Sequence, residues 1–463
     1  MSSITQVSDT MQTILTSRAK ALERESGFVE RSTAQLDGAI FSQTIVLTWM
    51  HTSEASYTQL RHTAASLGVQ VSNQAIEQRF SAASARLLRA LLEEAVGQVI
   101  SSEASAPEVL ARFNGVYVQD GTVISLPASL AHEWPGSGQV GQEAALRVQG
   151  QLELGSGSLS GLWLQAAHEA ERSGPAINTP LPVGSLFNAD MGYFTLSEMR
   201  QRGKQGQYWL TQSKATLTVI DHSGRCWDLL SFLQAQTSEE VDVDLFVGKR
   251  ERLPVRLIAV RVSPEEARRR REGANGRITH PPKGCQAPVP GKRKPKDQRQ
   301  GKRKGKKVSA ARLRLADWTI MLTNVPRDLL CVQEALVLLR CRWQIELLWK
   351  LWKQHGKLDT WRSYKPERIL TELYAKLLGL VITHWQVLIG CWQAPNRSLL
   401  KATQVVQWMT PCLALALTGL VPVHTIVERT AQMMQTGCTI NSRRKRPNTH
   451  QLLADPRLVR GLG

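Results

Sequence analysis

The chain has 463 residues, of which 42% are hydrophobic, and it carries 58 lysines and arginines against 39 aspartates and glutamates, a formal net charge of +19. This hydrophobic content excludes wholesale disorder, and the composition also excludes a collagen, a coiled-coil rod and a small disulfide scaffold. A positive excess of this size favours a polyanionic partner such as nucleic acid or an acidic membrane.

Residues 1–105 are predicted to be helical. The segment 63–68 is predicted to form a short helix closed by a glycine turn, and Ser72 is predicted to cap the next helix. The apolar residues of that second helix recur at helical spacing: Ile76, Phe80, Ala83 and Leu87. The two helices resemble a helix-turn-helix with a long connecting turn, and an ordinary helical hairpin is an equal alternative.

After this helical region the pattern changes to the alternation typical of strands. In RFNGVYVQDGTVISLP, the pair Asp120-Gly121 is a hairpin turn signal between two predicted strands. In GSLFNADMGYFTLSEM, a strand is predicted to run to Asp190. A helix is predicted to follow it, because Thr195 and Glu198 match a capping box.

Residues 207–262 are again rich in predicted strands. The next segment, 268–314, has 18 lysines and arginines and only two acids, so it accounts for +16 of the net charge. Glycine and proline interrupt its most basic part, 291–307, which is predicted to be a solvated loop. An unstructured linker and an arm that grips phosphates both fit this loop, and we favour the arm. Its candidate DNA-binding residues are Lys292, Arg293, Lys294, Lys302, Arg303 and Lys304.

The segment 317–326 is predicted to be a buried strand, and a long helix is predicted over about 328–356. On that helix Glu346 lies in a narrow stripe of cations beside a broad apolar face. The stripe includes Arg342, Lys350 and Lys353. Taken alone, it fits a solvated face with ion pairs between residues four positions apart.

The remainder of the chain is predicted to be mostly helical, with a basic cluster at 443–446. Two uncharged stretches, 377–396 and 402–427, are interrupted by polar residues or proline and are predicted to be buried core rather than membrane spans. The seven cysteines are scattered without a C-x-x-C pair, which suits a reducing compartment. We find no signal peptide at the start, and we expect a cytoplasmic protein without a membrane partner.

The glutamate helix carries a resemblance to a known family. Arg342, Glu346 and Lys353 match the pattern arginine, three residues, glutamate, six residues, lysine. This pattern resembles the signature of bacterial insertion-sequence transposases of the DDE type, in the insertion-sequence-four family. Leu339 departs from it, because the family has a DNA-contacting tyrosine at that position, and this one contact is in doubt.

Two further acids extend the resemblance. Asp120 in VQDGT and Asp190 in ADMGYF are similar to the family's first and second catalytic aspartates, and they precede Glu346 in the same order. The order of the predicted strands and the basic segment RRKRPNTHQLL near the end of the sequence also match the family's pattern. The resemblance covers roughly 110–460. Each aspartate motif is weak by itself, since a turn or strand-end residue would look the same, but the ordered combination is specific.

The resemblance implies a fold of the α/β class, with a ribonuclease H-like catalytic core interrupted by a β-rich insertion and flanked by helical regions. The expected parts are a helical DNA-binding region at 1–105, the first part of the core at 106–206, the insertion with its basic loop at 207–316, the second part of the core at 317–394 and a helical region at 395–463 that could serve dimerisation.

The resemblance also implies that Asp120, Asp190 and Glu346 are both the catalytic residues and the metal ligands. Carboxylate oxygens suit Mg²⁺, with Mn²⁺ as a substitute. Two such ions stabilise the attacking and leaving oxygens of an in-line phosphoryl displacement. The cations of the helix stripe would bind DNA phosphates near the scissile bond. The histidines show no metal-like spacing and no P-loop motif occurs, which argues against a zinc site and a P-loop ATPase.

The implied function is cleavage and strand transfer of DNA at the terminal inverted repeats of an insertion sequence, through a hairpin intermediate, by a homodimer that pairs two ends. In the family a tryptophan of the insertion packs on a flipped base. Trp209 and Trp227 are the candidates here, and a plain core role is the alternative for each. Two other functions remain open: a catalytically inactive, transposase-derived DNA-binding protein, which Leu339 allows, and a simple basic nucleic-acid-binding protein without a catalytic site.

Overall fold

The computed structural model describes most of the chain. The residues outside the description are 1–2, 30–34, 103–105, 139–141, 175–178, 191, 194, 214–215, 280–309, 393, 395, 441–446 and 463. The candidate DNA-binding residues of the basic loop therefore lie outside the described residues: Lys292, Arg293, Lys294, Lys302, Arg303 and Lys304. The same holds for the basic cluster 443–446.

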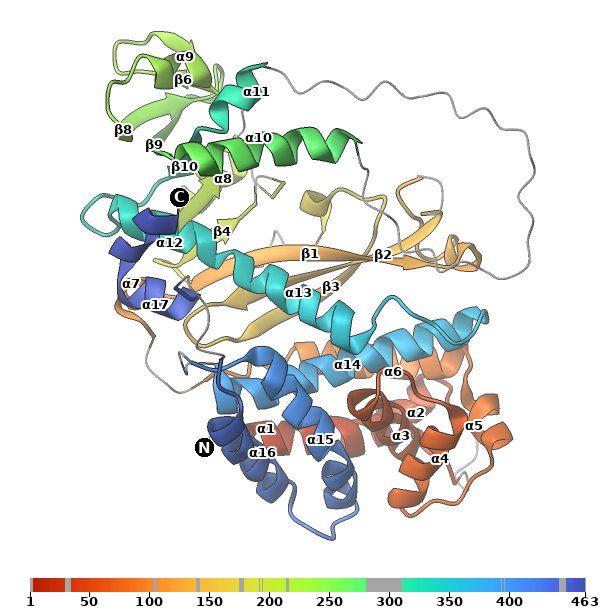
Figure 1. Cartoon of the computed structure of the whole chain (residues 1–463). Coiled ribbons are helices and arrows are strands. Elements are labelled where there is room, and N and C mark those ends of the chain that lie inside the picture. Colours follow the sequence, from red (N-terminus) through yellow and green to blue (C-terminus); the bar gives the residue numbers. More distant parts are fainter. Residues whose placement is uncertain are drawn as a thin grey trace.

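A mixed sheet of ten strands, counted over the described residues, runs through the molecule (Figure 1). In chain order the strands are β1 (Val116–Leu126), β2 (Ala144–Glu153), β3 (Leu159–Ala166), β4 (Leu186–Ala189), β5 (Tyr208–Gln212), β6 (Thr218–Ile220), β7 (Cys226–Asp228), β8 (Glu240–Val247), β9 (Leu253–Arg261) and β10 (Trp318–Thr323). Their order across the sheet is β3-β2-β1-β4-β5-β10-β9-β8-β6-β7. The strands β1, β4 and β5 run parallel, and the other neighbouring pairs are antiparallel.

This architecture confirms the predicted α/β class, the strand-rich region 207–262 and the buried strand within 317–326. The strands of 207–262 do not form a separate sheet. They continue the sheet of β1–β4 through β5 and β10.

Strand β1 continues through the Asp120-Gly121 pair, so the hairpin turn predicted there is wrong. Asp120 pairs with Gly150 and Gly121 pairs with Gln149 in the antiparallel ladder with β2. A Cβ at Gly121 would lie 3.3 Å from the Tyr193 hydroxyl and 3.3 Å from Cγ of Gln149. Glycine therefore serves close packing within the strand here, and not a turn.

The N-terminal helices are α1 (Ser3–Thr13), α2 (Ala19–Glu25), α3 (Gly38–His51), α4 (Tyr57–Ser66), α5 (Asn73–Arg79) and α6 (Ala82–Val96). The helical prediction is confirmed, including the glycine turn at Gly68, whose φ is +84°. The single helix predicted from Ser72 is wrong, because it is two helices. Ser72 caps α5, the backbone of Phe80 is extended, and the Ser81 hydroxyl then accepts a hydrogen bond from the backbone of α6.

The C-terminal helices are α14 (Pro366–Cys391), α15 (Leu399–Leu417), α16 (Val423–Gly437) and α17 (Thr449–Ala454). Among the described residues, α14 is the one helix long and apolar enough to cross a membrane, and 94% of its most apolar window is buried inside the protein. It packs against α3, α6 and α16, so the helices α1–α6 and α14–α16 from the two ends of the chain gather on one side of the sheet, whereas α17 packs against α12 and α7 (Figure 1). The predicted core role of 377–396 is confirmed for its helical part.

The long helix predicted over about 328–356 is two consecutive helices, α12 (Val332–Cys341) and α13 (Trp343–Gly356), separated at Arg342. Both lie across the sheet in Figure 1, where α13 passes over β1 and β2. The backbone of Arg342 keeps right-handed helical angles (φ −53°, ψ −30°), so the chain keeps its direction at the break. The remaining helices are α7 (Glu108–Ala111), α8 (Leu196–Lys204), α9 (Leu229–Gln234), α10 (Pro264–Thr279) and α11 (Ala310–Leu315).

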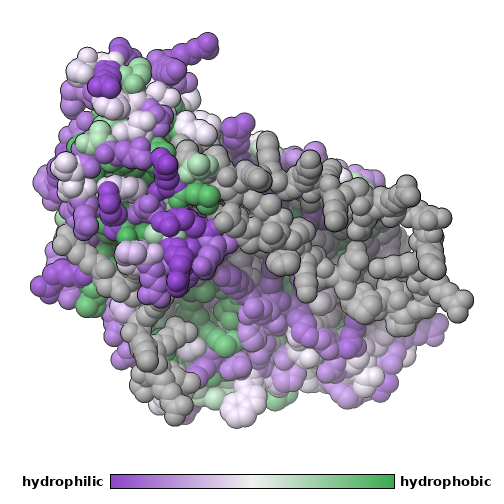
Figure 2. Space-filling model, turned by 45° about the horizontal axis from the view of Figure 1, so that its top comes forward, coloured by the Kyte–Doolittle hydropathy of each residue, from purple (hydrophilic) through white to green (hydrophobic). Residues whose placement is uncertain are grey.

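The face of the molecule shown in Figure 2 is mainly hydrophilic where its residues are described, with apolar residues in small groups.

The predicted capping box at the start of α8 is confirmed. The Thr195 hydroxyl accepts from the Glu198 amide at 3.2 Å, and the Glu198 carboxylate accepts from the Thr195 amide at 2.8 Å.

Candidate active site

Asp120 and Asp190 occupy matching positions on neighbouring parallel strands. In the ladder between β1 and β4, Val118 pairs with Asn188, and Gln119 pairs with Ala189. Each aspartate follows the last pair by one residue, so the register places the two side by side where the ladder ends. Paired residues of a parallel ladder point to the same face, about 4.8 Å apart. The two predicted aspartates therefore come together on one face of the sheet.

The alternation along β4 identifies that face. Phe187 and Ala189 belong to a core that also contains Tyr193 and Trp209 on the opposite face. Asn188 is fully buried on the other side and donates from Nδ2 to the carbonyl of Leu338 in α12 at 2.6 Å. This bond fastens the helix pair α12–α13 to the strand that leads to Asp190.

Helix α13 lies along β1 and brings Glu346 to the same face. A Cβ at Gly150, the residue paired with Asp120, would lie 2.8 Å from Cη2 of Trp349, so the indole packs directly on β2. One turn further on, Nζ of Lys353 donates to the carbonyl of Val123 in β1 at 2.8 Å. The glycine opposite Asp120 thus allows the helix to approach the sheet closely.

Glu346 is held by the predicted arginine. The Arg342 guanidinium lies 3.0 Å from the Glu346 carboxylate, and the two side chains are only 18% and 22% exposed. At this depth an ion pair fixes orientation, because both side chains have few other positions available. The arginine spaced four residues before the glutamate therefore orients it.

Charge and burial change the acidity of Asp120. Burial raises the pKa of Asp120 to about 7, the Gly121 amide opposes this by bonding the carboxylate, and the negative charge of Glu346 raises it further. Arg342 lowers this pKa and Glu171 raises it. Asp120 and Glu346, two of the three predicted carboxylates, are therefore electrostatic neighbours.

Two residues of this site were not predicted from the sequence. The Glu171 carboxylate lies 3.9 Å from Nε of Arg147, and it raises the pKa of both Asp120 and Tyr193. Tyr193 is 2% exposed, its amide donates to the Asp190 carbonyl at 3.0 Å, and its hydroxyl has no hydrogen-bond partner among the described residues. The Gly-Tyr-Phe sequence after the second aspartate was the one available signal for Tyr193.

Asp120, Asp190 and Glu346 are carboxylates, the type of ligand that a hard divalent cation prefers. A bound cation would also offset the charge of Glu346, which raises the pKa of Asp120. In their present arrangement, the described residues contain no group of three or more His, Cys, Asp or Glu side chains that could hold a metal ion. The Glu346 carboxylate is turned toward Arg342. Metal binding would require these side chains to rotate toward one another.

The other predicted residues lie in different settings. Nζ of Lys350 lies 4.1 Å from the centroid of the Trp343 ring. Trp209 is 1% exposed, so of its two interpretations the core role holds. Trp227 is half-buried, donates from Nε1 to Asp221 at 2.9 Å and lies on β7 at the far edge of the sheet. Leu339 packs, partly buried, against the main core.

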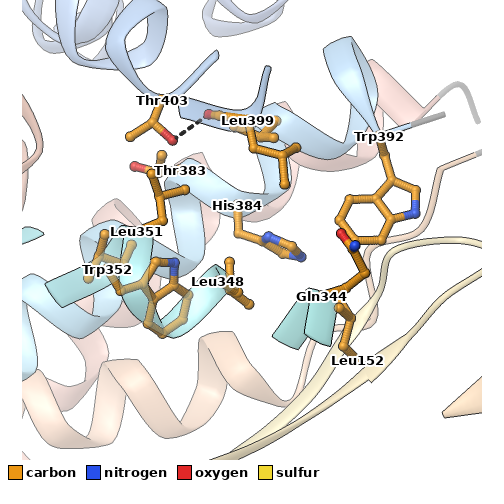
Figure 3. A pocket seen from close by; sticks show the side chains of 12 residues that line it. Leu152, Gln344, Leu348, Leu351, Trp352, Thr383, His384, Trp392, Leu399 and Thr403 are labelled. Atoms are coloured by element: carbon orange, nitrogen blue, oxygen red, sulfur yellow. Dashed lines mark hydrogen bonds between the residues drawn. The ribbon is translucent and has the colours of Figure 1, made fainter. Parts of the chain in front are cut away.

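A buried pocket lies between α13, α14 and α15 (Figure 3). The α13 residues that line it are Gln344, Leu348, Leu351 and Trp352. His384 of α14 points into the same space, and its Nε2 lies 2.9 Å from the carbonyl of Gly157. Burial lowers the pKa of His384 to about 4, so this imidazole is neutral. None of the three predicted acids is among the residues that line this pocket.

Comparison with known proteins agrees with this geometry. The family described as "Transposase DDE domain" matches residues 112–382, a span that holds all three acids. The chain belongs to this family. A DDE transposase domain cuts and transfers DNA strands and depends on divalent metal ions, so the predicted DDE transposase, an enzyme that acts on DNA, is confirmed.

The relatives are transposases of insertion sequences. The chain is 23% identical over 382 residues to the transposase for insertion sequence element IS231C of Bacillus thuringiensis subsp. berliner, covering 78% of this chain and 75% of that protein. It is 21% identical over 335 residues to the transposase for IS1151 of Clostridium perfringens, covering 68% and 65%. A shorter match, 35% over 80 residues, covers 17% of this chain and 22% of the putative transposase InsL for IS186A of Escherichia coli (strain K12).

Proposed function

We propose that this DDE transposase belongs to the insertion-sequence-four type, cleaves the terminal inverted repeats of its element and joins them to target DNA, with Asp120, Asp190 and Glu346 as catalytic residues. The observation that carries the proposal is the register of β1 and β4. It sets the two aspartates side by side, on the face over which α13 brings the glutamate. A catalytically inactive derivative would gain nothing from an aspartate at position 120, where the surroundings disfavour the charged form.

The topology supports a ribonuclease H-like core. The strand order β3-β2-β1-β4-β5, with β1, β4 and β5 parallel, forms one half of the sheet, and strands from the long interval between Asp190 and Glu346 form the other half. Within the predicted insertion 207–316, we assign to the β-rich insertion the part that follows β5, since β5 pairs with β4 of the core half. In the same proposal 1–105 binds DNA, 395–463 serves dimerisation of a homodimer that pairs two ends, and the protein acts in the cytoplasm.

The three carboxylates would hold the Mg²⁺ ions, two in number, with Mn²⁺ as a substitute. When bound, these ions supply positive charge at the attacking and leaving oxygens of the phosphoryl transfer. The chain's own groups prepare the site. Arg342 holds Glu346 at the edge of the site.

The cations of α13 and of the basic loop would contact DNA phosphates. Arg342, Lys350 and Lys353 lie on the helix that carries the catalytic glutamate, where a phosphate contact fixes the position of the scissile bond. The six loop cations 292–294 and 302–304 would add affinity, because electrostatic contacts with phosphates need no particular fold. Replacing all six by glutamine should reduce the slope of log K against log salt by about 5. An unchanged slope would mean that the loop is only a linker.

The test of the function is a cleavage assay with the full-length protein, a duplex carrying the element's own ends, and Mg²⁺ or Mn²⁺. We expect the wild type to cut the ends, and Glu346→Gln to bind the same duplex without cutting it. Glu239→Gln, at an exposed position before β8, is the matched control and should cut normally. No cutting by the wild type, or equal cutting by Glu346→Gln, would contradict the proposed function.

A further inference from the structure

The last segment of the chain packs on the helices that lead to Glu346. Helix α17 and the 3₁₀-helix that follows it, Pro456–Leu462, lie against α12 (Figure 1). Leu452 is fully buried, and Val459 is 9% exposed, in the main core. Ile345 and Leu348 of α13 belong to the same core. The C-terminal segment is therefore built into the part of the molecule that supports the glutamate helix.

A hydrogen bond joins this segment directly to α13. Nε2 of Gln344 donates to Oγ1 of Thr449 at 2.6 Å, across 105 positions of the sequence, and both residues are partly buried. Thr449 is the first residue of α17, and Asn448 before it caps that helix. Oδ1 of Asn448 accepts from the Gln451 amide at 2.9 Å, and the Asn448 amide donates to the Gln451 side chain at 2.9 Å. The capped helix start thus fixes the position of the Thr449 hydroxyl.

The bond attaches to the turn of α13 that carries the catalytic acid. Gln344 stands two residues before Glu346, which places it about 160° around the helix at about 100° per residue. Arg342, at the cap position of α13, makes no side-chain cap bond among the described residues and pairs instead with Glu346. A bond to Gln344 therefore opposes rotation of this first turn about the helix axis.

Such a rotation would matter for the chemistry. Side chains of an α-helix end about 5–6 Å from its axis, so a turn of about 20° moves a carboxylate by about 2 Å. A misplacement of about 1 Å can slow a reaction by about 10²-fold. The later turns of α13 have separate anchors, because Trp349 packs on β2 and Lys353 donates to the Val123 carbonyl. The bond to Thr449 thus acts on the first turn in particular.

We propose that Thr449 is a positioning residue for DNA cleavage, which acts through Gln344 to hold the first turn of α13 and to aim Glu346 at the two aspartates. The inference rests on the proposed function, because Glu346 is the catalytic glutamate there. The C-terminal segment would thus help to align the acids from inside the protein, without contact to the DNA strand or to a metal ion.

The first test separates cutting from binding, with full-length protein. Thr449→Val keeps the shape of the side chain and removes the acceptor. We expect it to cut a saturating element-end duplex in Mg²⁺ about tenfold more slowly in a single turnover. Its affinity for the same duplex in EDTA should stay within about twofold of the wild type. Thr449→Ser keeps the hydroxyl and should restore cutting to within about threefold.

A double-mutant cycle assigns the effect to the bond. Gln344→Met removes the donor and should slow cutting to a similar extent. Because both substitutions act on one bond, the double variant Gln344→Met/Thr449→Val should cut no more slowly than the slower single variant. Effects that multiply in full would overturn the proposal, since the two side chains would then act independently.

The second test needs no DNA and no cutting. Binding of Mn²⁺ is followed by loss of the free-ion signal in electron paramagnetic resonance. Thr449→Val should bind Mn²⁺ about threefold or more weakly than the wild type, because the carboxylates no longer converge. The matched control is Thr418→Val at the exposed end of α15, which removes a hydroxyl that donates to the Leu415 carbonyl at 2.7 Å. It should match the wild type in both tests.

The outcomes distinguish this inference from the proposed function. Normal cutting and normal Mn²⁺ binding by Thr449→Val would refute the positioning role alone. Loss of duplex binding and a lower melting temperature together with slower cutting, without rescue by Thr449→Ser, would also refute it and make the C-terminal segment a general support of the fold. A wild type that binds Mn²⁺ but does not cut would refute the catalytic proposal, and the Mn²⁺ titration of Thr449→Val would still decide the positioning role.

Discussion

Replacement of Asp120 by asparagine should stabilise the folded protein at neutral and alkaline pH while abolishing cleavage. Burial, and the charges of Glu346 and Glu171, raise the pKa of Asp120 from 3.8 to about 7. The folded state therefore binds this proton more tightly than the unfolded state does. Stability must fall as the pH rises from about 4 to about 7, and asparagine escapes that loss because it carries no charge.

The size of the effect follows from the shift. A rise from 3.8 to about 7 corresponds to at most about 4 kcal/mol of unfolding free energy at 1.36 kcal/mol per unit. The whole of it acts above about pH 7, and none of it acts below about pH 4, where the carboxyl is neutral in both states. Asp120→Asn should thus gain most over the wild type near pH 8.

The assay is thermal melting of the wild type and Asp120→Asn in EDTA between pH 4 and pH 8.5, with Asp328→Asn, an exposed position, as the control. The gap between Asp120→Asn and the wild type should open with rising pH. Adding Mn²⁺ at pH 8 should raise the melting temperature of the wild type more than that of Asp120→Asn, because a bound cation stabilises the charged site. A gap that is constant across the pH range would refute the reasoning.

Three further substitutions test the packing and the charges around Asp120 and Asp190. Gly150→Ala would place a Cβ 2.8 Å from Cη2 of Trp349, so we expect a loss of about 1–3 kcal/mol in unfolding free energy by chemical denaturation. Asn188→Leu would leave the buried carbonyl of Leu338 without its donor, at a cost of about 1–3 kcal/mol, and should lower cleavage more than DNA binding. Glu171→Gln removes one charge that raises the pKa of Asp120. The variant should therefore lose stability in EDTA over a lower pH range than the wild type does. An unchanged range would show that Glu171 does not act on Asp120.

Much of the local structure could be predicted because local signals decided it. The capping box of Thr195 and Glu198 marked the start of α8, and both of its hydrogen bonds are present. Asp190 follows β4 directly, as the strand pattern indicated. The cation stripe around Glu346 reflects a helix whose opposite face is buried, which is the arrangement that helical spacing predicts.

The errors arose where a local signal competed with tertiary packing. Asp120-Gly121 has the composition of a turn, but Gly121 pairs with Gln149 inside a strand, and the Tyr193 ring occupies the space that a side chain would need. In the N-terminal region, Ser81 offered a second cap, so the helix from Ser72 ends at Arg79, about two turns before the last apolar residue of its predicted spacing, Leu87. Neither outcome depends on residues within a short window.

The meeting of the acids was beyond local prediction. No residue near Asp120 in the sequence indicates that Asp190 is its neighbour across the ladder. That neighbour depends on the register of β1 with β4. Glu171 was missed for the same reason, since its effect on Asp120 acts through space from a short helical turn between β3 and β4. The resemblance to the family supplied this information in place of physical reasoning from the residues.

The charge of the chain divides into two parts with different tasks. Arg342 is engaged with Glu346, and Lys353 donates to the Val123 carbonyl, so these cations of α13 are oriented by the protein before DNA arrives. Oriented cations position a phosphate, but the charge of Arg342 is already offset by Glu346, so this arginine attracts DNA weakly from a distance. The segment 268–314, with +16 of the +19, has few acids to offset it. Long-range attraction should therefore come from that segment and positioning of the cut strand from α13, which is why loss of the loop charges should change the salt dependence of binding.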